Sequence, residues 1–427
     1  MSDGSIRTGR VESLAYGAHG VVRIDGKVHF VRRVVPGDEI ELAVREDRGT
    51  FAYSDLVAVR EPGRARRDPP CDYLPRCGGC PWQHVDYAAQ AEAKERAVRD
   101  LLARVGGIAD PPVRPILRAD REFGYRRRLG LRVEGKRLGF LAAASHDLVP
   151  VERCLLAAPE LDGAIAIAAR WIAELRTTIK RLEIAATGEG ERFALVGQGE
   201  GRFAPADALA TEAMRGREPR VAAAVLHGRG WRRVFGDDAV TVPLIDGDEM
   251  HLRAGGFSQV GDAGNALLIR TVIDLAVPTA GETFADLYAG AGNLGIPLAR
   301  RGVRVLAVER TRASVEAARA NARRLGLDVE FQAGDVPEVL DRWIGETRRL
   351  DAVVLDPPRN GAAEAVPRLS RLSPARIVYV SCNPATLARD VRSLAADYRL
   401  ERVQPIDFFP QTYHVESVAL LVRRATS

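Results

Sequence analysis

The segment FADLYAGAGNLGIPLARRG (284–302) decides the fold of this chain. Its apolar start ends in Asp286, and a turn follows that holds Gly290, Gly292 and Gly295. A helical pattern begins after the turn. Glycine lets the backbone turn tightly and approach a ligand closely. A strand, a glycine-rich turn and a helix predict the first part of a βαβ unit, and therefore a parallel sheet wound by helices.

The same alternation continues toward the C-terminus, which predicts one α/β domain over residues 249–427. Ligands of such sheets bind at the carboxyl ends of the strands. The segments that alternate are VRVLAVER (303–310), ASVEAARANARRLGL (313–327), VEFQAGD (329–335), DAVVLDPP (351–358) and ARIVYVSC (375–382).

The N-terminal part of the chain has a different pattern. Residues 5–60 contain five short β-rich runs separated by turns, which predicts a small barrel within a first domain, 1–62. A linker rich in Pro and Arg (61–70) follows. The middle domain, 63–248, is expected to be rich in strands. It also has helical patterns at 86–107, which we expect to pack on the third domain, and at 161–176.

Composition limits the class of protein. The chain has 427 residues, of which 46% are hydrophobic and 28% charged, as in ordinary globular proteins. It has no apolar run long enough to span a membrane, and its start, MSDGSIRTGR, lacks the apolar core of a secretory signal. We therefore expect the cytoplasm, a reducing compartment in which clustered cysteines favour metal over disulfides.

Four of the five cysteines form a candidate metal site. Cys71, Cys77 and Cys80 lie within CDYLPRCGGC, and Cys154 lies far downstream. Four thiolates suit a metal or an iron–sulfur centre, because such centres take soft sulfur ligands.

The fifth cysteine, Cys382, is a candidate nucleophile. It lies in YVSCNPATLARD (379–390), between a predicted strand and a helix that begins near Pro384. The amides and dipole of that helix are predicted to favour a thiolate. The alternative is a buried structural cysteine, which is common for free Cys.

Acidic residues mark further candidate positions. Glu309 ends the strand after the glycine-rich turn, where a carboxylate can bind ribose hydroxyls. The glycine spacing alone also fits a dinucleotide site. Asp335 and the rigid loop DPPRNG (356–361) favour S-adenosylmethionine (SAM), although the loop also reads as a structural turn. Glu416 is either a general base or a surface acid in an ion pair.

Positive charge is concentrated in one segment. The net charge is +5, and residues 111–140 carry nine Arg and Lys against three acids. Arg126, Arg127 and Arg128 follow Tyr125, a combination that suits RNA or DNA but also an ordinary solvated surface.

Taken together, these motifs resemble the RNA uracil-5-methyltransferase family, and most closely its iron–sulfur branch that methylates a uridine of 23S ribosomal RNA. The resemblance covers nearly the whole chain and includes GFSQV (256–260). It implies a class I (Rossmann-like) methyltransferase sheet, an N-terminal OB-like TRAM barrel that binds RNA, and a β-rich iron–sulfur middle domain. One departure is Tyr288-Ala289, where this branch usually has Phe-Cys.

The resemblance also implies roles for single residues. Cys382 would attack C6 of uracil, and Glu416 would remove the C5 proton after methyl transfer. The target base would be flipped out of its stack, and Phe257 would stack on it or on a neighbour. A [4Fe–4S] cluster would be bound by Cys71, Cys77, Cys80 and Cys154. The implied SAM contacts are Gln259, Tyr288, Asn293, Glu309, Asp335 and Asp356.

The expected partner is therefore RNA, with no membrane partner, and we expect a monomer. Three alternatives stay open: the same chemistry on a transfer RNA uridine, a cytosine-5 methyltransferase, and a non-catalytic RNA-binding or redox module. Cytosine enzymes that act on DNA carry a Pro-Cys pair, whereas Ser381 precedes Cys382 here. A module without catalysis would not need Cys382, which lies in the best-formed motif.

Overall fold

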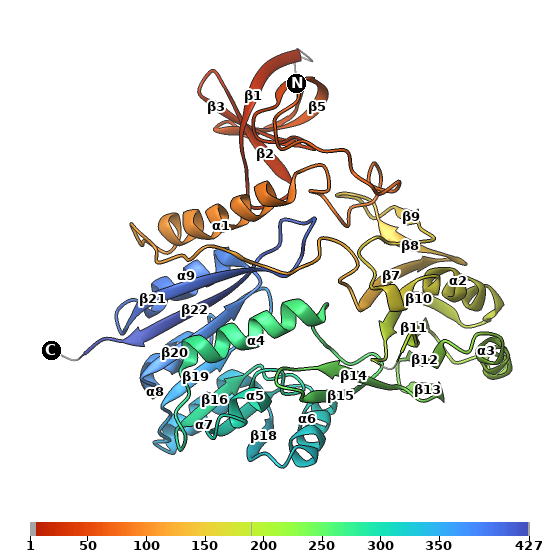
Figure 1. The fold of residues 1–427 in the computed structure, drawn as a ribbon, viewed down its shortest axis with the longest axis vertical. Helices are drawn as coiled ribbons and strands as arrows, with labels where there is room; N and C mark the ends of the chain where they lie inside the picture. Colours follow the sequence, from red (N-terminus) through yellow and green to blue (C-terminus); the bar gives the residue numbers. More distant parts are fainter. Residues whose placement is uncertain (1–5, 189, 426–427) are drawn as a thin grey trace.

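The computed structural model describes residues 6–188 and 190–425. The outermost residues of the first and third predicted domains, 1–5 and 426–427, lie outside this part. In Figure 1 the N-terminal barrel stands at one end, the helix α1 lies between it and the C-terminal sheet, and a second sheet lies to one side. Over the described residues, no helix is both long enough and apolar enough to cross a membrane.

The first body is a closed five-stranded barrel with the strand order β1-β2-β3-β5-β4, as the sequence predicts. Alternate residues point inward and build a small core from Val11, Val22, Val31, Ile40 and Leu42. The strands are β1 (Ile6–Leu14), β2 (His19–Ile24), β3 (Lys27–Arg32), β4 (Glu39–Asp47) and β5 (Phe51–Glu61).

A single long helix, α1 (Tyr87–Arg104), follows the cysteine segment. The Asp86 side chain caps its N-terminus by accepting a hydrogen bond from the Ala88 amide. The helix packs on α9 and β21 of the C-terminal sheet. Lys94 of α1 forms an ion pair with Asp407 at 2.6 Å, and both side chains are fully buried.

The middle of the chain forms a seven-stranded sheet in the order β13-β12-β11-β10-β7-β8-β9. The sequence predicts the helix α2 (Ala164–Glu174) but not α3 (Ala206–Arg217). Two of the three buried residues of α3 are polar, Asp207 and Thr211, so its apolar period is weak. The strands are β7 (Arg128–Glu134), β8 (Arg137–Leu141), β9 (Leu148–Pro150), β10 (Thr178–Ala186), β11 (Phe193–Glu200), β12 (Val221–Gly228) and β13 (Trp231–Gly236).

The third body is an eight-stranded sheet in the order β18-β17-β16-β19-β20-β22-β21-β6. Strands β16 to β20 are parallel, whereas β22 is antiparallel to both its neighbours. The strands are β6 (Leu117–Arg118), β16 (Thr283–Leu287), β17 (Arg304–Glu309), β18 (Val329–Ala333), β19 (Ala352–Leu355), β20 (Arg376–Ser381), β21 (Tyr398–Asp407) and β22 (Glu416–Arg423).

Helices cover both faces of this sheet (Figure 1). One face carries α4 (Asp262–Ala276), α5 (Gly295–Ala299) and α6 (Arg312–Arg324). The other carries α1, α7 (Val336–Gly345), α8 (Val366–Leu372) and α9 (Pro384–Leu394). A hairpin of β14 (Ala239–Pro243) and β15 (Glu249–Arg253) leads into α4. The strand β6 joins this sheet from a segment far upstream, which no local pattern predicts.

Candidate active site

The candidate residues gather at the carboxyl edge of the parallel strands. Glu309 is the last residue of β17, Asp356 follows β19, and Cys382 follows β20. From β16 the chain adds β17 and β18 on one side of the sheet, and then returns to add β19 and β20 on the other side. Strand order therefore reverses between β16 and β19. Ligands of α/β sheets bind at such a reversal.

The glycine-rich turn after β16 is shaped for a close ligand. Gly290 and Gly292 have φ values of 56° and 99°, and Tyr288 also has a positive φ of 63°. The Gly290 amide donates to Oε2 of Glu309 at 3.2 Å, and the Thr311 amide donates to Oε1 at 2.7 Å. The carboxylate of Glu309 is therefore held against the turn before any ligand arrives.

The helix α4 is tied to the same turn. Asn293 of the turn and Asn265 of α4 exchange two side-chain hydrogen bonds of 2.8 and 2.9 Å. Gln259 lies in the partly exposed loop just before α4. That loop is fixed from the middle sheet, because the Arg127 amide donates to the Val260 carbonyl at 2.9 Å. Asp335 occupies the N-cap position of α7 at the neighbouring strand end, without a capping hydrogen bond from its side chain.

Asp286 is a site residue that the sequence does not single out. It is 1% exposed, and its Oδ2 has no hydrogen-bond partner in the part of the chain that the structure describes. Burial raises the pKa of Asp286 to about 8, and Asp356 and Glu309 add to the rise. Burial likewise raises the pKa of Asp356 to about 7. The signal in the sequence is an acid at the end of an otherwise apolar strand.

Cys382 and Glu416 meet across two neighbouring strands. Ser381 of β20 pairs with Ser417 of β22, so Cys382 and Glu416 occupy the next position in this register. Glu416 is 4% exposed, and its Oε1 has no partner among the described residues. The side chain of Asn383 caps α9 by accepting from the Ala385 amide at 3.1 Å. A thiol therefore lies beside a buried carboxyl group.

The protonation of this pair corrects one prediction. Burial raises the pKa of Cys382 to about 11, and Glu416 adds to the rise. Arg359 lowers it by less, so the resting group is a thiol and not the thiolate predicted from the helix dipole. Burial and Asp356 also raise the pKa of Glu416 well above its usual range. Once ionised, a carboxylate with a raised pKa is a stronger base than an ordinary one.

The barrel reaches this site as well. The Tyr16 hydroxyl, between β1 and β2, donates to the Cys382 carbonyl at 3.4 Å. Its ring meets that of Tyr413 edge-on, with centroids 5.8 Å apart. The sequence does not indicate this contact, which joins residues 366 positions apart.

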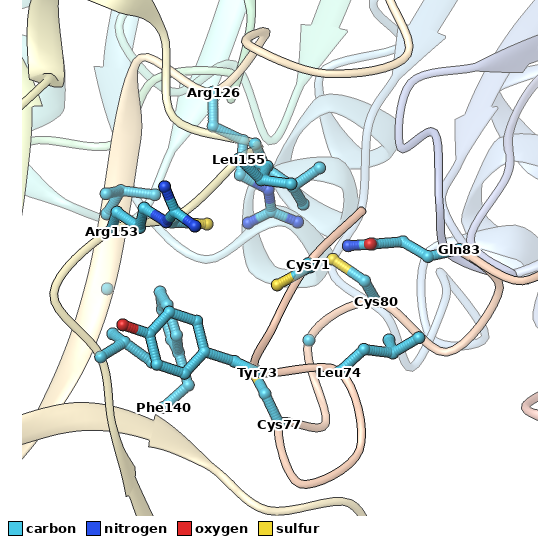
Figure 2. A pocket seen from close by; sticks show the side chains of 16 residues that line it. Cys71, Tyr73, Leu74, Cys77, Cys80, Gln83, Arg126, Phe140, Arg153 and Leu155 are labelled. Carbon is cyan, nitrogen blue, oxygen red and sulfur yellow. The ribbon is translucent and has the colours of Figure 1, made fainter. Parts of the chain in front are cut away.

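The four remaining cysteines line one cavity of about 170 Å³. Figure 2 shows Arg126 and Gln83 on two sides of the Cys71 and Cys80 side chains. Burial raises the pKa of Cys77 and Cys154, and raises that of Cys80 to about 12. Across residues 6–188 and 190–425, no three His, Cys, Asp or Glu side chains are arranged to hold one metal ion.

The arginine run does not form a free cationic surface. Arg127 donates to both oxygens of Asp262 at 2.9 and 3.0 Å. Arg128 pairs with Glu183, and Arg126 lines the cysteine cavity. These arginines therefore also serve contacts within the chain, and their role in binding the RNA backbone stays a prediction. Phe257, by contrast, is 66% exposed.

Comparisons with known proteins agree with this geometry. The family model described as tRNA (Uracil-5-)-methyltransferase matches residues 344–424, and that described as Methyltransferase small domain matches residues 249–371. A 23S rRNA (uracil(1939)-C(5))-methyltransferase from Aromatoleum aromaticum is 34% identical over 97% of this chain and 99% of its own length. The protein of that name from Pseudomonas aeruginosa is 36% identical over 96% of this chain and 92% of its own.

A solved structure is similar over the whole chain. It is the Pyrococcus abyssi tRNA (uracil-54, C5)-methyltransferase in complex with S-adenosyl-L-homocysteine. The TM-score is 0.75 at 26% sequence identity, and the match covers 97% of this chain and 100% of that one.

Proposed function

The chain belongs to the RNA uracil-5-methyltransferase family, and on this premise we propose that it methylates a specific uridine of 23S ribosomal RNA. Its activity is SAM-dependent methylation of uracil at C5 in RNA. The pairing of Cys382 with the buried Glu416 at the carboxyl edge of the sheet supports the uracil C5 chemistry, and the similarity to two 23S ribosomal RNA enzymes over nearly the whole chain carries the choice of ribosomal RNA. Uracil C5 is a poor nucleophile. It becomes reactive when a sulfur nucleophile adds to C6, and a base is then needed to remove the C5 proton.

In this proposal the Cys382 thiol first releases its proton to water. Its Sγ atom then bonds to C6 of the flipped uracil, and the electrons of the C5–C6 double bond form an enolate. C5 then takes the methyl group, and S-adenosylhomocysteine leaves. Glu416 accepts the C5 proton, the double bond returns, and the C6–Sγ bond breaks. Glu416 has to enter this step as a carboxylate, and its raised pKa, to which Asp356 contributes, then makes it a stronger base.

The methyl donor would bind along the glycine-rich turn. We assign the ribose hydroxyls to Glu309, whose carboxylate is already oriented by two amides. The other proposed contacts lie at neighbouring strand ends or in the loop before α4: Gln259, Tyr288, Asn293, Asp335 and Asp356.

We also propose that Cys71, Cys77, Cys80 and Cys154 hold a [4Fe–4S] cluster. Four thiols around one cavity of about 170 Å³ fit a centre with several irons better than one ion, whose sulfur ligands would lie about 2.3 Å from it. Arg126 lines this cavity. Its Nε atom is buried with no hydrogen-bond partner among residues 6–188 and 190–425, and would be free to donate to the cluster. Such a site is consistent with the cytoplasm, where thiols stay reduced.

The barrel offers a surface that fits single-stranded RNA. Four partly exposed rings on β2, β3 and β5 form one cluster, with centroids 5.5 to 6.3 Å apart: His19, Phe30, Phe51 and Tyr53. Arg32 donates to His19 at its edge. Unpaired bases stack on aromatic rings whatever their sequence.

The likeness to a transfer RNA enzyme keeps a transfer RNA uridine as the second candidate substrate. The test is methyl transfer from labelled SAM to 23S ribosomal RNA and to transfer RNA, followed by mapping of 5-methyluridine. We expect one uridine of the ribosomal RNA to be labelled. Labelling of transfer RNA alone would establish the second candidate, and labelled cytosine would refute both.

A further inference from the structure

The loop that delivers Glu416 depends on one unusual glutamine. Residues 408–415 connect β21 to β22, and Gln411 lies in their middle. It is fully buried, with no exposed area, and its φ is +71°. A non-glycine residue keeps this left-handed conformation only when its surroundings hold it.

The surrounding residues form hydrogen bonds with both the backbone and the side chain of Gln411. Its Oε1 accepts hydrogen bonds from Arg67 at 2.8 Å and from Gln90 at 3.0 Å. Its backbone amide donates to Oε1 of Gln90 at 2.9 Å. Its carbonyl accepts from the Trp82 amide at 3.1 Å, and its Nε2 donates to Glu122 at 3.1 Å. Gln411 is therefore the centre of a buried hydrogen-bond network.

Two of these partners flank the cysteine segment. Arg67 precedes Cys71, and Trp82 follows Cys80. Arg67 also donates to the Gln83 carbonyl at 3.1 Å, and the Gln83 backbone amide donates to the Cys80 carbonyl at 3.5 Å. Gln83 is seen beside Cys80 in Figure 2. The hydrogen-bonded path from Cys80 to Gln411 thus passes through the backbone of Gln83 and the side chain of Arg67.

The loop is equally well fixed on both sides of Gln411. Lys94 donates to the Phe409 carbonyl at 3.0 Å, and Tyr125 donates to the Pro410 carbonyl at 3.1 Å. The Thr412 hydroxyl accepts from the His414 amide at 3.2 Å. A displacement of Gln411 would therefore be transmitted along a constrained backbone to Glu416.

We propose that Gln411 is a positioning residue that fixes Glu416 against the cysteine-bearing segment, so that the cluster site supports the proton-removal step of the reaction. The inference rests on the proposed function. Glu416 acts only after methyl transfer, so a misplaced Glu416 should leave the earlier steps intact. The methylated RNA should then stay bonded to Cys382.

The test compares Gln411→Gly with Gln404→Ala. Glycine keeps the positive φ and removes the side-chain amide. Gln404, on β21, makes a matched hydrogen bond to the Pro115 carbonyl at 2.7 Å but does not contact the loop network. Each purified protein is mixed with SAM and RNA, and the covalent protein–RNA band is measured on denaturing gels. Turnover and SAM affinity are measured in parallel.

We expect Gln411→Gly to turn over on the order of tenfold to a hundredfold more slowly, as for a small displacement of a catalytic group. It should accumulate the methylated adduct and bind SAM as the wild type does. Gln404→Ala should behave as the wild type. Gln90→Ala, which removes the partner on α1, should give the same adduct if Gln411→Gly fails to fold.

Wild-type protein stripped of iron should show the same accumulation of adduct. Slow turnover without an adduct would refute the inference, because general damage to the fold slows every step. Turnover of Gln411→Gly and Gln90→Ala at the wild-type rate would refute it too. A wild type that methylates no uracil would instead refute the proposed function.

Discussion

The chain contains two cysteine sites that share one residue type and differ in their neighbours. At both, burial raises the pKa of the thiol. Cys382 lies beside Glu416 and Asp356, which add to the rise, with Arg359 opposing them. The cavity cysteines lie beside one another and Arg126, whose charge favours thiolates. Acid neighbours suit proton transfer and covalent chemistry, whereas sulfur and cationic neighbours suit a metal centre.

The largest effect should come from the isolated cysteine. Cys382→Ala removes the group proposed to bond C6, so methylation should fall by roughly 10⁴-fold or more. Filter binding of labelled RNA and SAM should be close to that of the wild type. Methylation of RNA by this variant within tenfold of the wild-type rate would show that no covalent adduct is needed.

Glu416→Gln should separate the two halves of the reaction. The amide keeps the shape of the side chain but cannot accept the C5 proton, so steady-state turnover should fall roughly 10² to 10⁴-fold. One methyl group should still be transferred, and the protein should then stay joined to RNA through Cys382. A denaturing gel with labelled SAM measures this band. Rapid turnover without the band would assign the proton to another acceptor, and Asp356, whose charge raises the pKa of Glu416, is the next candidate.

Whether the sequence predicts a contact at these two sites depends on how far apart the contacting residues lie along the chain. Local sequence patterns predict the barrel, the helix α1 and the two strand ends that carry Glu309 and Cys382. They do not predict the contacts of Tyr16 with Cys382 and of Gln90 with Gln411, because these contacts join residues more than 300 positions apart. The ion pair of Arg127 with Asp262 is also hidden in the sequence, because these two residues lie 135 positions apart. From the sequence alone Arg127 therefore looks like a surface charge.

The resting protonation of Cys382 also escapes the sequence. A helix N-terminus favours a thiolate, but burial and two nearby carboxyl groups act in the opposite direction and prevail. Neither burial nor the approach of β22 is visible in SCNP (381–384).

A pH profile tests this balance. With a pKa of about 11, Cys382 is almost entirely a thiol at neutral pH. Since the thiolate is the nucleophile, single-turnover adduct formation should rise with pH by up to about tenfold per unit below that pKa. In Glu416→Gln the carboxyl group that raises the Cys382 pKa is gone, so the profile should move to lower pH. A flat wild-type profile between neutral and alkaline pH would show that RNA binding has already released the proton.

The smallest effect on methyl transfer should come from the cavity cysteines. Cys154→Ser replaces one soft ligand by a hard one, so the purified protein should lose most of the iron, about four per chain, expected of the wild type. Cys382 and its strand are not altered, so single-turnover adduct formation should fall by less than about tenfold. Release of the methylated RNA should slow more, because the segment that hydrogen-bonds Gln411 is no longer fixed by the cluster.

The measurements are iron content, sulfide content, adduct formation and product release. Each is made beside the control Cys382→Ser, which should keep the iron and lose the adduct. Stoichiometric zinc without sulfide in the wild type would contradict the cluster. Loss of adduct formation in Cys154→Ser as complete as in Cys382→Ser would abolish the distinction between the two sites, because each would then be required for the same step.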